Sequence, residues 1–89
     1  MTERRTNDRQ RVLKAAKIVW NKGSSVLDCT MRNISKSGAM VEVVNTLSVP
    51  DEFELRWDDN AQRQQCIVVW RKLSRLSVKF ANGPPRGVS

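Results

Sequence analysis

Two short polar patterns contain the residues of this sequence best suited to bind a phosphorylated ligand. The first lies at the N-terminus, where Arg4 directly precedes an RxxxR pattern formed by Arg5 and Arg9. The second is the NxSxxG pattern of residues 33–38. Arginine guanidinium groups bind phosphate oxygens through paired hydrogen bonds, and amide and hydroxyl side chains add further donors and acceptors. The two patterns therefore indicate anion binding.

The distribution of charge supports this interpretation. The chain has a formal net charge of +7, and residues 1–22 contain seven lysines and arginines but only two acidic residues. A concentrated basic segment attracts polyanions through its long-range field. Nucleic acid, anionic lipid and small phosphorylated ligands all remain open at this point, because charge alone does not distinguish them.

Catalysis and metal binding are not expected. The chain has no histidine, and its two cysteines, Cys29 and Cys66, lack the spacing of a zinc site. The serines have only carboxylates of turns and exposed strand faces to act as bases, so we predict that the protein is not an enzyme and uses no cofactor. We also expect no signal peptide, no membrane insertion and a reduced pair of cysteines in the cytoplasm.

The rest of the chain must position these patterns, and its periodicity is that of β-strands. Phe53, Leu55 and Trp57 alternate with charged residues, and segments 26–34, 65–70 and 76–80 also place apolar residues at every second position. Segment 39–44 is apolar and β-branched, and the alanines of 13–20 allow a helix, but its Ile-Val-Trp ending before a turn favours a strand. The expected strands are 13–20, 26–34, 39–44, 53–57, 65–70 and 76–80. With 89 residues and no long helical segment, the chain predicts one antiparallel sandwich or closed barrel. We expect residues 1–11 to form a flexible arm, 12–81 the β-domain and 82–89 a disordered tail.

The expected core consists of apolar residues that share the inner phase of these strands. At this size their side chains fill the interior, so any binding site must lie on the outer surface. We also expect the three tryptophans, Trp20, Trp57 and Trp70, to pack in the barrel, although Trp70 can offer an aromatic surface near the site. The expected core residues are Ile18, Leu27, Met31, Val41, Phe53, Leu55, Val68, Val78 and Phe80.

The order of the two patterns, about two dozen residues apart and followed by strands, resembles the PilZ family, whose signature is RxxxR followed by (D/N)xSxxG. The segments 68–71 (VVWR) and 76–80 (LSVKF) look like that family's last strands, so the resemblance covers residues 3–81. It implies a six-stranded antiparallel β-barrel of the split-barrel type that binds cyclic di-GMP and signals to a partner protein. The proline- and glycine-containing tail leaves little or no C-terminal helix.

The resemblance also implies a set of binding residues. Arginine can bind guanine O6 and N7 or phosphate, and Asn33 can meet the N1 and N2 edge of guanine. An arginine directly before RxxxR accompanies two intercalated ligands in PilZ-like proteins, so Arg4 predicts two cyclic di-GMP molecules per chain. The complete expected set is Arg4, Arg5, Arg9, Asn33, Ser35 and Gly38.

Two other functions remain open. The first is an adaptor that binds proteins but no nucleotide. The second is a small basic barrel that binds single-stranded nucleic acid, which is disfavoured because the chain has no tyrosine and only two phenylalanines for base stacking. A single domain of this kind must act through another protein or through dimerisation, so we expect a downstream partner and a monomer or weak dimer.

Overall fold

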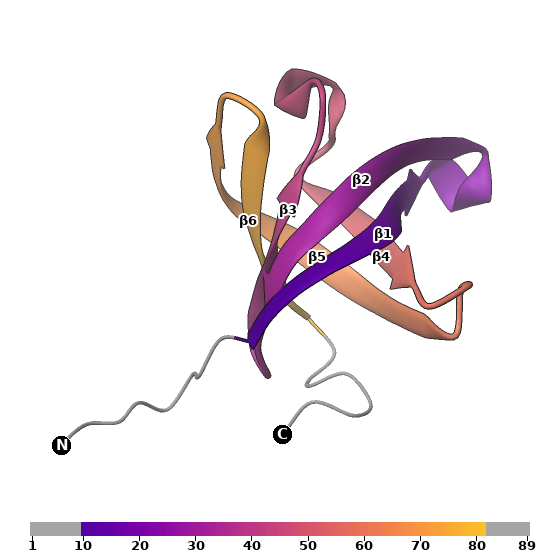
Figure 1. Ribbon diagram of the computed structural model, residues 1–89. Helices are drawn as coiled ribbons and strands as arrows, with labels where there is room; N and C mark the ends of the chain where they lie inside the picture. Colours follow the sequence, from indigo (N-terminus) through magenta and orange to yellow (C-terminus); the bar gives the residue numbers. More distant parts are fainter. Residues whose placement is uncertain (1–9, 82–89) are drawn as a thin grey trace, which may run out of the picture.

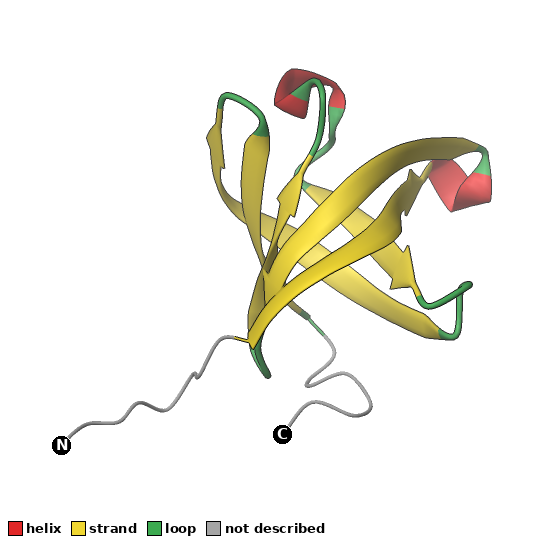
Figure 2. Ribbon diagram, in the orientation of Figure 1, coloured by secondary structure: helices red, strands yellow, loops and turns green. Residues whose placement is uncertain are grey.

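Six β-strands form a closed antiparallel barrel in the computed structural model, which describes residues 10–81 (Figure 1). Two short 3-10 turns, η1 (Asn21–Gly23) and η2 (Thr46–Ser48), lie between strands (Figure 2). The expected six-stranded all-β barrel is therefore confirmed. The strands are β1 (Gln10–Trp20), β2 (Ser25–Ile34), β3 (Gly38–Glu42), β4 (Glu52–Trp57), β5 (Gln62–Lys72) and β6 (Arg75–Phe80).

The strands follow the order β1-β2-β3-β6-β5-β4 around the barrel, and β1 also pairs with β4 to close it. β2 and β3 form the expected hairpin, with the NxSxxG pattern at its loop. Closure leaves no long unpaired sheet edge, which is the reason small antiparallel sheets favour it. None of the helical segments in the described part of the chain is long and apolar enough to cross a membrane.

Most strands extend further than the apolar pattern predicted. β1 begins at Gln10, inside the segment assigned to the arm, and β5 spans Gln62–Lys72 rather than 65–70. The added positions are mostly polar and lie at strand ends, where backbone pairing continues without a buried side chain. For example, Gln10 pairs with Ile34 and Gln62 with Trp57. Hydrophobic periodicity misses such positions because it detects burial and not pairing.

The interior is close to the predicted core. Seven of the nine expected residues are buried, and the other two, Leu27 and Val68, are half-buried against the same cluster. Trp57 is buried and packs against Phe80, with ring centroids 6.4 Å apart. Trp20 is partly buried. The prediction that Trp70 also packs inside is wrong, since 41% of its surface is exposed.

A β-bulge explains the position of Trp70. The β5–β6 register shifts between Val68 and Trp70, so one extra residue enters β5 and reverses the expected alternation. Similar shifts occur in β1–β2 between Arg11 and Lys14, and in β2–β3 before Asn33. Bulges redirect side chains, and these three alter the outer surface of the strands that surround the NxSxxG loop.

Cys29 and Cys66 are free and buried, and burial raises the pKa of each thiol from 9.0 to about 12. Above pH 9 the unfolded chain therefore loses thiol protons that the folded chain keeps. We expect the free energy of unfolding to fall as pH rises from 9, by up to about 1.4 kcal/mol per pH unit for each thiol.

Urea unfolding at pH 8, 9 and 10, compared between the wild type and Cys29→Ala/Cys66→Ala, measures this contribution. The ion pair with Asp28 raises the pKa of Lys17, so both proteins also lose some free energy of unfolding at alkaline pH as this lysine deprotonates. If the free energy of unfolding falls equally with pH in the two proteins, the whole pH dependence comes from lysines.

Candidate functional site

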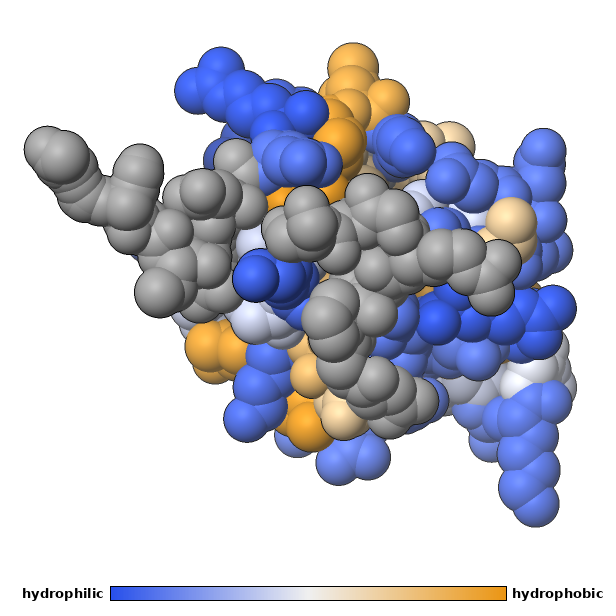
Figure 3. All heavy atoms as spheres, turned by 90° about the horizontal axis from the view of Figure 1, so that it is seen from below, coloured by the Kyte–Doolittle hydropathy of each residue, from blue (hydrophilic) through white to orange (hydrophobic). Residues whose placement is uncertain are grey.

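The pairing of β1 with β2 places the residues that directly follow the first polar pattern beside the second pattern. Gln10, the first residue of β1, pairs with Ile34, and Arg11 pairs with Asn33. The arm that carries Arg4, Arg5 and Arg9 is thus joined to the barrel directly beside the NxSxxG loop. Figure 3 views this end of the barrel, where the described surface is mostly hydrophilic. Arg4, Arg5 and Arg9 themselves lie outside the described residues.

Ser35 holds the loop between β2 and β3. Only 1% of its surface is exposed, and its hydroxyl oxygen accepts hydrogen bonds from the backbone N–H groups of Ser37 (3.2 Å) and Gly38 (3.3 Å). The backbone N–H of Ser35 also donates to the carbonyl oxygen of Gly38 at 2.8 Å. The serine of the motif is therefore a turn-forming residue in this structure, and its contact with a ligand remains a prediction.

Gly38 starts β3 at a point where β6 approaches very closely. A Cβ atom at this position would lie 2.1 Å from the backbone oxygen of Val78, closer than any allowed contact. Its φ is not in the left-handed region, so a positive φ is not the reason for glycine at this position. The reason visible in the fold is the close packing of β3 against β6.

A row of residues paired in register extends from this loop across five strands, and all of them are exposed or half-buried except Ser77, which is 7% exposed. In register, Arg11 pairs with Asn33, Asn33 with Met40, Met40 with Ser77 and Ser77 with Trp70. Lysines and arginines flank the row. We call this outer surface the basic face; it comprises Arg11, Arg32, Asn33, Met40, Trp70, Lys72, Arg75, Ser77 and Lys79.

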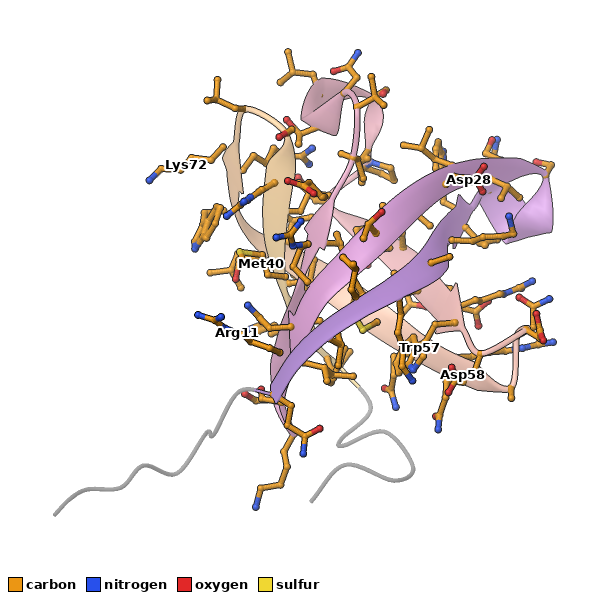
Figure 4. The ribbon with its side chains drawn as sticks, in the orientation of Figure 1. Arg11, Asp28, Met40, Trp57, Asp58 and Lys72 are labelled. Carbon is orange, nitrogen blue, oxygen red and sulfur yellow. The ribbon has the colours of Figure 1, made fainter. Side chains whose placement is uncertain are left out.

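The basic face contains a shallow hollow of about 440 Å³ beside Asn33. Its wall includes Arg11, Met40 and Arg75. This volume is in the range of small-molecule sites. In Figure 4, Arg11, Met40 and Lys72 project from the same side of the barrel. The hollow therefore lies between the attachment point of the arm and the exposed ring of Trp70.

Positive charge exceeds negative charge on this face. Glu42 is shared by two arginines, with its carboxylate oxygens 3.2 Å from Arg32 and 3.4 Å from Arg75. Within residues 10–81 no carboxylate pairs with Arg11 or Lys79. The Lys72 ammonium group lies 5.8 Å from the centre of the Trp70 ring. The face therefore offers cationic side chains to an anionic ligand and an aromatic ring to its base.

A larger hollow of about 520 Å³ lies on another side, where β1 and β2 meet the β4–β5 turn. Its charges are largely compensated, because Lys17 pairs with Asp28 at 2.7 Å and the nearby Lys14 pairs with Asp58 at 3.2 Å. This hollow is the larger of the two, but an anionic ligand is attracted less strongly to cations that already have carboxylate partners. We therefore assign the candidate site to the basic face.

The sequence predicted only Asn33 and Trp70 among the nine residues of the basic face. The others, such as Met40 and Arg75, were not singled out, because they come together only through the strand register. The one available signal was that each occupies an outward phase of its strand. In the part of the chain that the structure describes, no three His, Cys, Asp or Glu side chains are grouped so that they could hold a metal ion.

Comparison with known proteins gives the family. A search among curated proteins found no significant match. The sequence does match the PilZ domain over residues 3–88, which is nearly the whole chain. The match includes both polar patterns, and the closed six-stranded barrel agrees with the fold that the resemblance implied. The chain therefore belongs to the PilZ domain family.

Proposed function

We propose that this chain is a cyclic di-GMP receptor that binds the dinucleotide between its N-terminal arm and the basic face. PilZ domains are binding domains of a cyclic di-GMP receptor family. The observation that carries the proposal for this chain is the β1–β2 register, which attaches the arginine-bearing arm opposite Ile34, beside the NxSxxG loop. The residue that follows the first motif therefore lies beside the second motif, which supports a shared binding site.

The chemistry of the site matches that of the ligand. Cyclic di-GMP has two phosphate charges and two guanine bases. Arg5 and Arg9 supply guanidinium groups for phosphate and for guanine O6 and N7, and Asn33 offers an amide to the base edge. The exposed ring of Trp70 provides a surface on which a base can stack, with Lys72 beside it. Binding fixes the arm against the barrel.

In this proposal the protein signals through a change in its conformation and surface charge when the ligand binds. The ligand neutralises positive charge on the arm and the basic face, and the altered surface is recognised by a downstream protein. We propose that the chain acts without a cofactor, as a monomer or weak dimer. We place it in the cytoplasm, since both cysteines are free and buried and reducing compartments preserve thiols.

Isothermal titration calorimetry with cyclic di-GMP at about 150 mM salt tests this function, because simple charge attraction is well screened there. We expect specific binding of the dinucleotide and little heat with GMP at the same concentration. Equal binding of GMP and cyclic di-GMP, or no binding of either, would reject the receptor function and favour the nucleotide-independent adaptor.

The same titration determines the stoichiometry. We expect about two ligands per chain in the wild type and about one in Arg4→Ala, because Arg4 supplies the guanidinium that the second ligand needs. Lys22→Ala is a control for charge, since this exposed lysine lies in η1, outside the basic face. A wild-type stoichiometry of one would reject the role given to Arg4 while leaving the receptor function intact.

A further inference from the structure

Three nearly fully exposed apolar side chains lie together at the end of the barrel opposite the start of β1. They are Val44 (96% exposed), Leu47 (85%) and Leu73 (96%), and we call them the apolar cap. Figure 1 shows η2 and the β5–β6 turn side by side at this end, away from the NxSxxG loop. Isolated exposed leucines are common, but a group of them marks a contact surface.

Hydrogen bonds hold the two segments of the cap together. The Thr46 hydroxyl donates to the carbonyl oxygen of Leu73 at 3.0 Å, and the backbone N–H of Val43 donates to the carbonyl oxygen of Ser74 at 2.8 Å. These bonds join the residues next to Val44 and Leu47 to the turn that carries Leu73. The two segments that carry the three side chains are therefore held next to each other.

Arg71 fixes the η2 segment from below. Its guanidinium donates to the carbonyl oxygens of Thr46 and Val49 (2.6 Å for Val49) and to the Asp51 carboxylate at 2.6 Å. Three acceptors on one arginine define the path of residues 46–51. A preorganised surface loses little conformational entropy on binding, which favours recognition.

The backbone of Leu73 supplies an independent argument. Its φ is +43°, in the left-handed region, where glycine, asparagine and aspartate are favoured in two-residue hairpin turns. A leucine at this position is strained, and its exposed side chain gains no packing in return. The fold thus gives no reason for leucine here, whereas a contact with another molecule does.

We infer that the apolar cap is the docking surface for a partner protein whose contact segment combines apolar side chains with carboxylates. Lys72 and Arg75 stand on either side of the turn that carries Leu73, and the chain has a net charge of +7. Arg75 shares the Glu42 carboxylate with Arg32, whereas Lys72 has no carboxylate partner among residues 10–81. A second copy would bring the same cations against each other, whereas an acidic partner would pair with them. Three side chains make a small contact, so the complex is transient.

This inference deepens the proposed function by naming a docking surface for the partner. Lys72 and Arg75 belong both to the edge of this surface and to the basic face, and the inference rests on the proposed function only for the signal that the ligand sends. The test uses a phage-displayed library of random twelve-residue peptides. Peptides are selected on the full chain and counter-selected on Leu47→Ser/Leu73→Asn. We expect the retained peptides to combine large apolar residues with Asp or Glu, and to bind the double variant at least tenfold more weakly by fluorescence anisotropy.

Measurements of Tm and of cyclic di-GMP binding show whether a variant loses peptide binding through the cap itself or through loss of the fold. Leu73→Asn should leave Tm unchanged or raise it, because asparagine tolerates a positive φ, while it still weakens peptide binding. Val26→Ser, a change at an exposed valine on β2 outside the cap, should leave peptide binding unchanged. Cyclic di-GMP titrations of these variants should match the wild type; if the wild type itself binds no cyclic di-GMP, the proposed function fails and the peptide result stands.

Three results would overturn the docking surface. The first is that no retained peptide distinguishes the wild type from the double variant. The second is a consensus without acidic residues. The third is sedimentation showing a wild-type dimer that Leu47→Ser/Leu73→Asn abolishes, because the occupant would then be a second copy.

Discussion

Replacing Arg9 or Arg5 with alanine is expected to weaken cyclic di-GMP binding about 10- to 150-fold each, while the ligand-free barrel keeps its Tm. Each change removes charge-assisted hydrogen bonds worth roughly 1.5–3 kcal/mol. The described core cluster begins at Ala16, so we expect Arg5 and Arg9 to add little to the stability of the barrel. Calorimetric titration at about 150 mM salt and thermal unfolding of the same samples measure both quantities.

Arg63→Ala is the matched control for this prediction. It removes the same charge from β5, but at a position paired with Arg56 on β4, away from the basic face. We expect its binding constant to stay within a factor of about three of the wild type at this ionic strength. If Arg63→Ala weakens binding as much as Arg9→Ala, net charge and not the motif attracts the ligand. A large fall in Tm for Arg9→Ala would instead give that residue a structural role.

The strands could be predicted because burial leaves a period of two in the sequence. Phe53, Leu55 and Trp57 alternate with charged residues, and all three are buried in β4. Strand ends could not be predicted in the same way. Gln10 and Gln62 extend their strands through backbone pairing, and no apolar pattern in the sequence records such pairing.

Only the part of the site that is contiguous in the sequence could be predicted. The NxSxxG loop could be recognised because its residues are adjacent in sequence. The other wall of the hollow, with Met40 and Arg75, depends on which residues of β2, β3 and β6 lie opposite one another. Bulges change that register by one residue, and the bulge before Trp70 turned an expected core side chain into an exposed one.

Two of the motif residues have roles in the barrel that need no ligand. The Ser35 hydroxyl forms hydrogen bonds within the loop, and the absence of a side chain at Gly38 lets β6 pack close to β3. Arg5 and Arg9 lie outside the described residues, and the proposed function gives them a role in ligand binding. The two halves of the PilZ signature should therefore respond differently to mutation, one through stability and the other through affinity.

Gly38→Ala is accordingly expected to destabilise the fold strongly. The new methyl group would lie 2.1 Å from the Val78 backbone oxygen, and backbone atoms of neighbouring strands cannot move aside without breaking the β3–β6 pairing. We expect a loss of about 3–5 kcal/mol in the free energy of unfolding, or failure to fold. The corresponding fall in Tm is on the order of 15 °C, measured by tryptophan fluorescence.

Gly23→Ala gives the comparison that isolates this contact. Gly23 has a φ of +91°, and a Cβ there would meet nothing within 4 Å, so only backbone strain of about 1–2 kcal/mol is expected. If Gly38→Ala is no less stable than Gly23→Ala, the approach of β6 does not require the glycine. The close approach of a ligand would then be the remaining reason for it, and Gly38→Ala would have to lose cyclic di-GMP binding while staying folded.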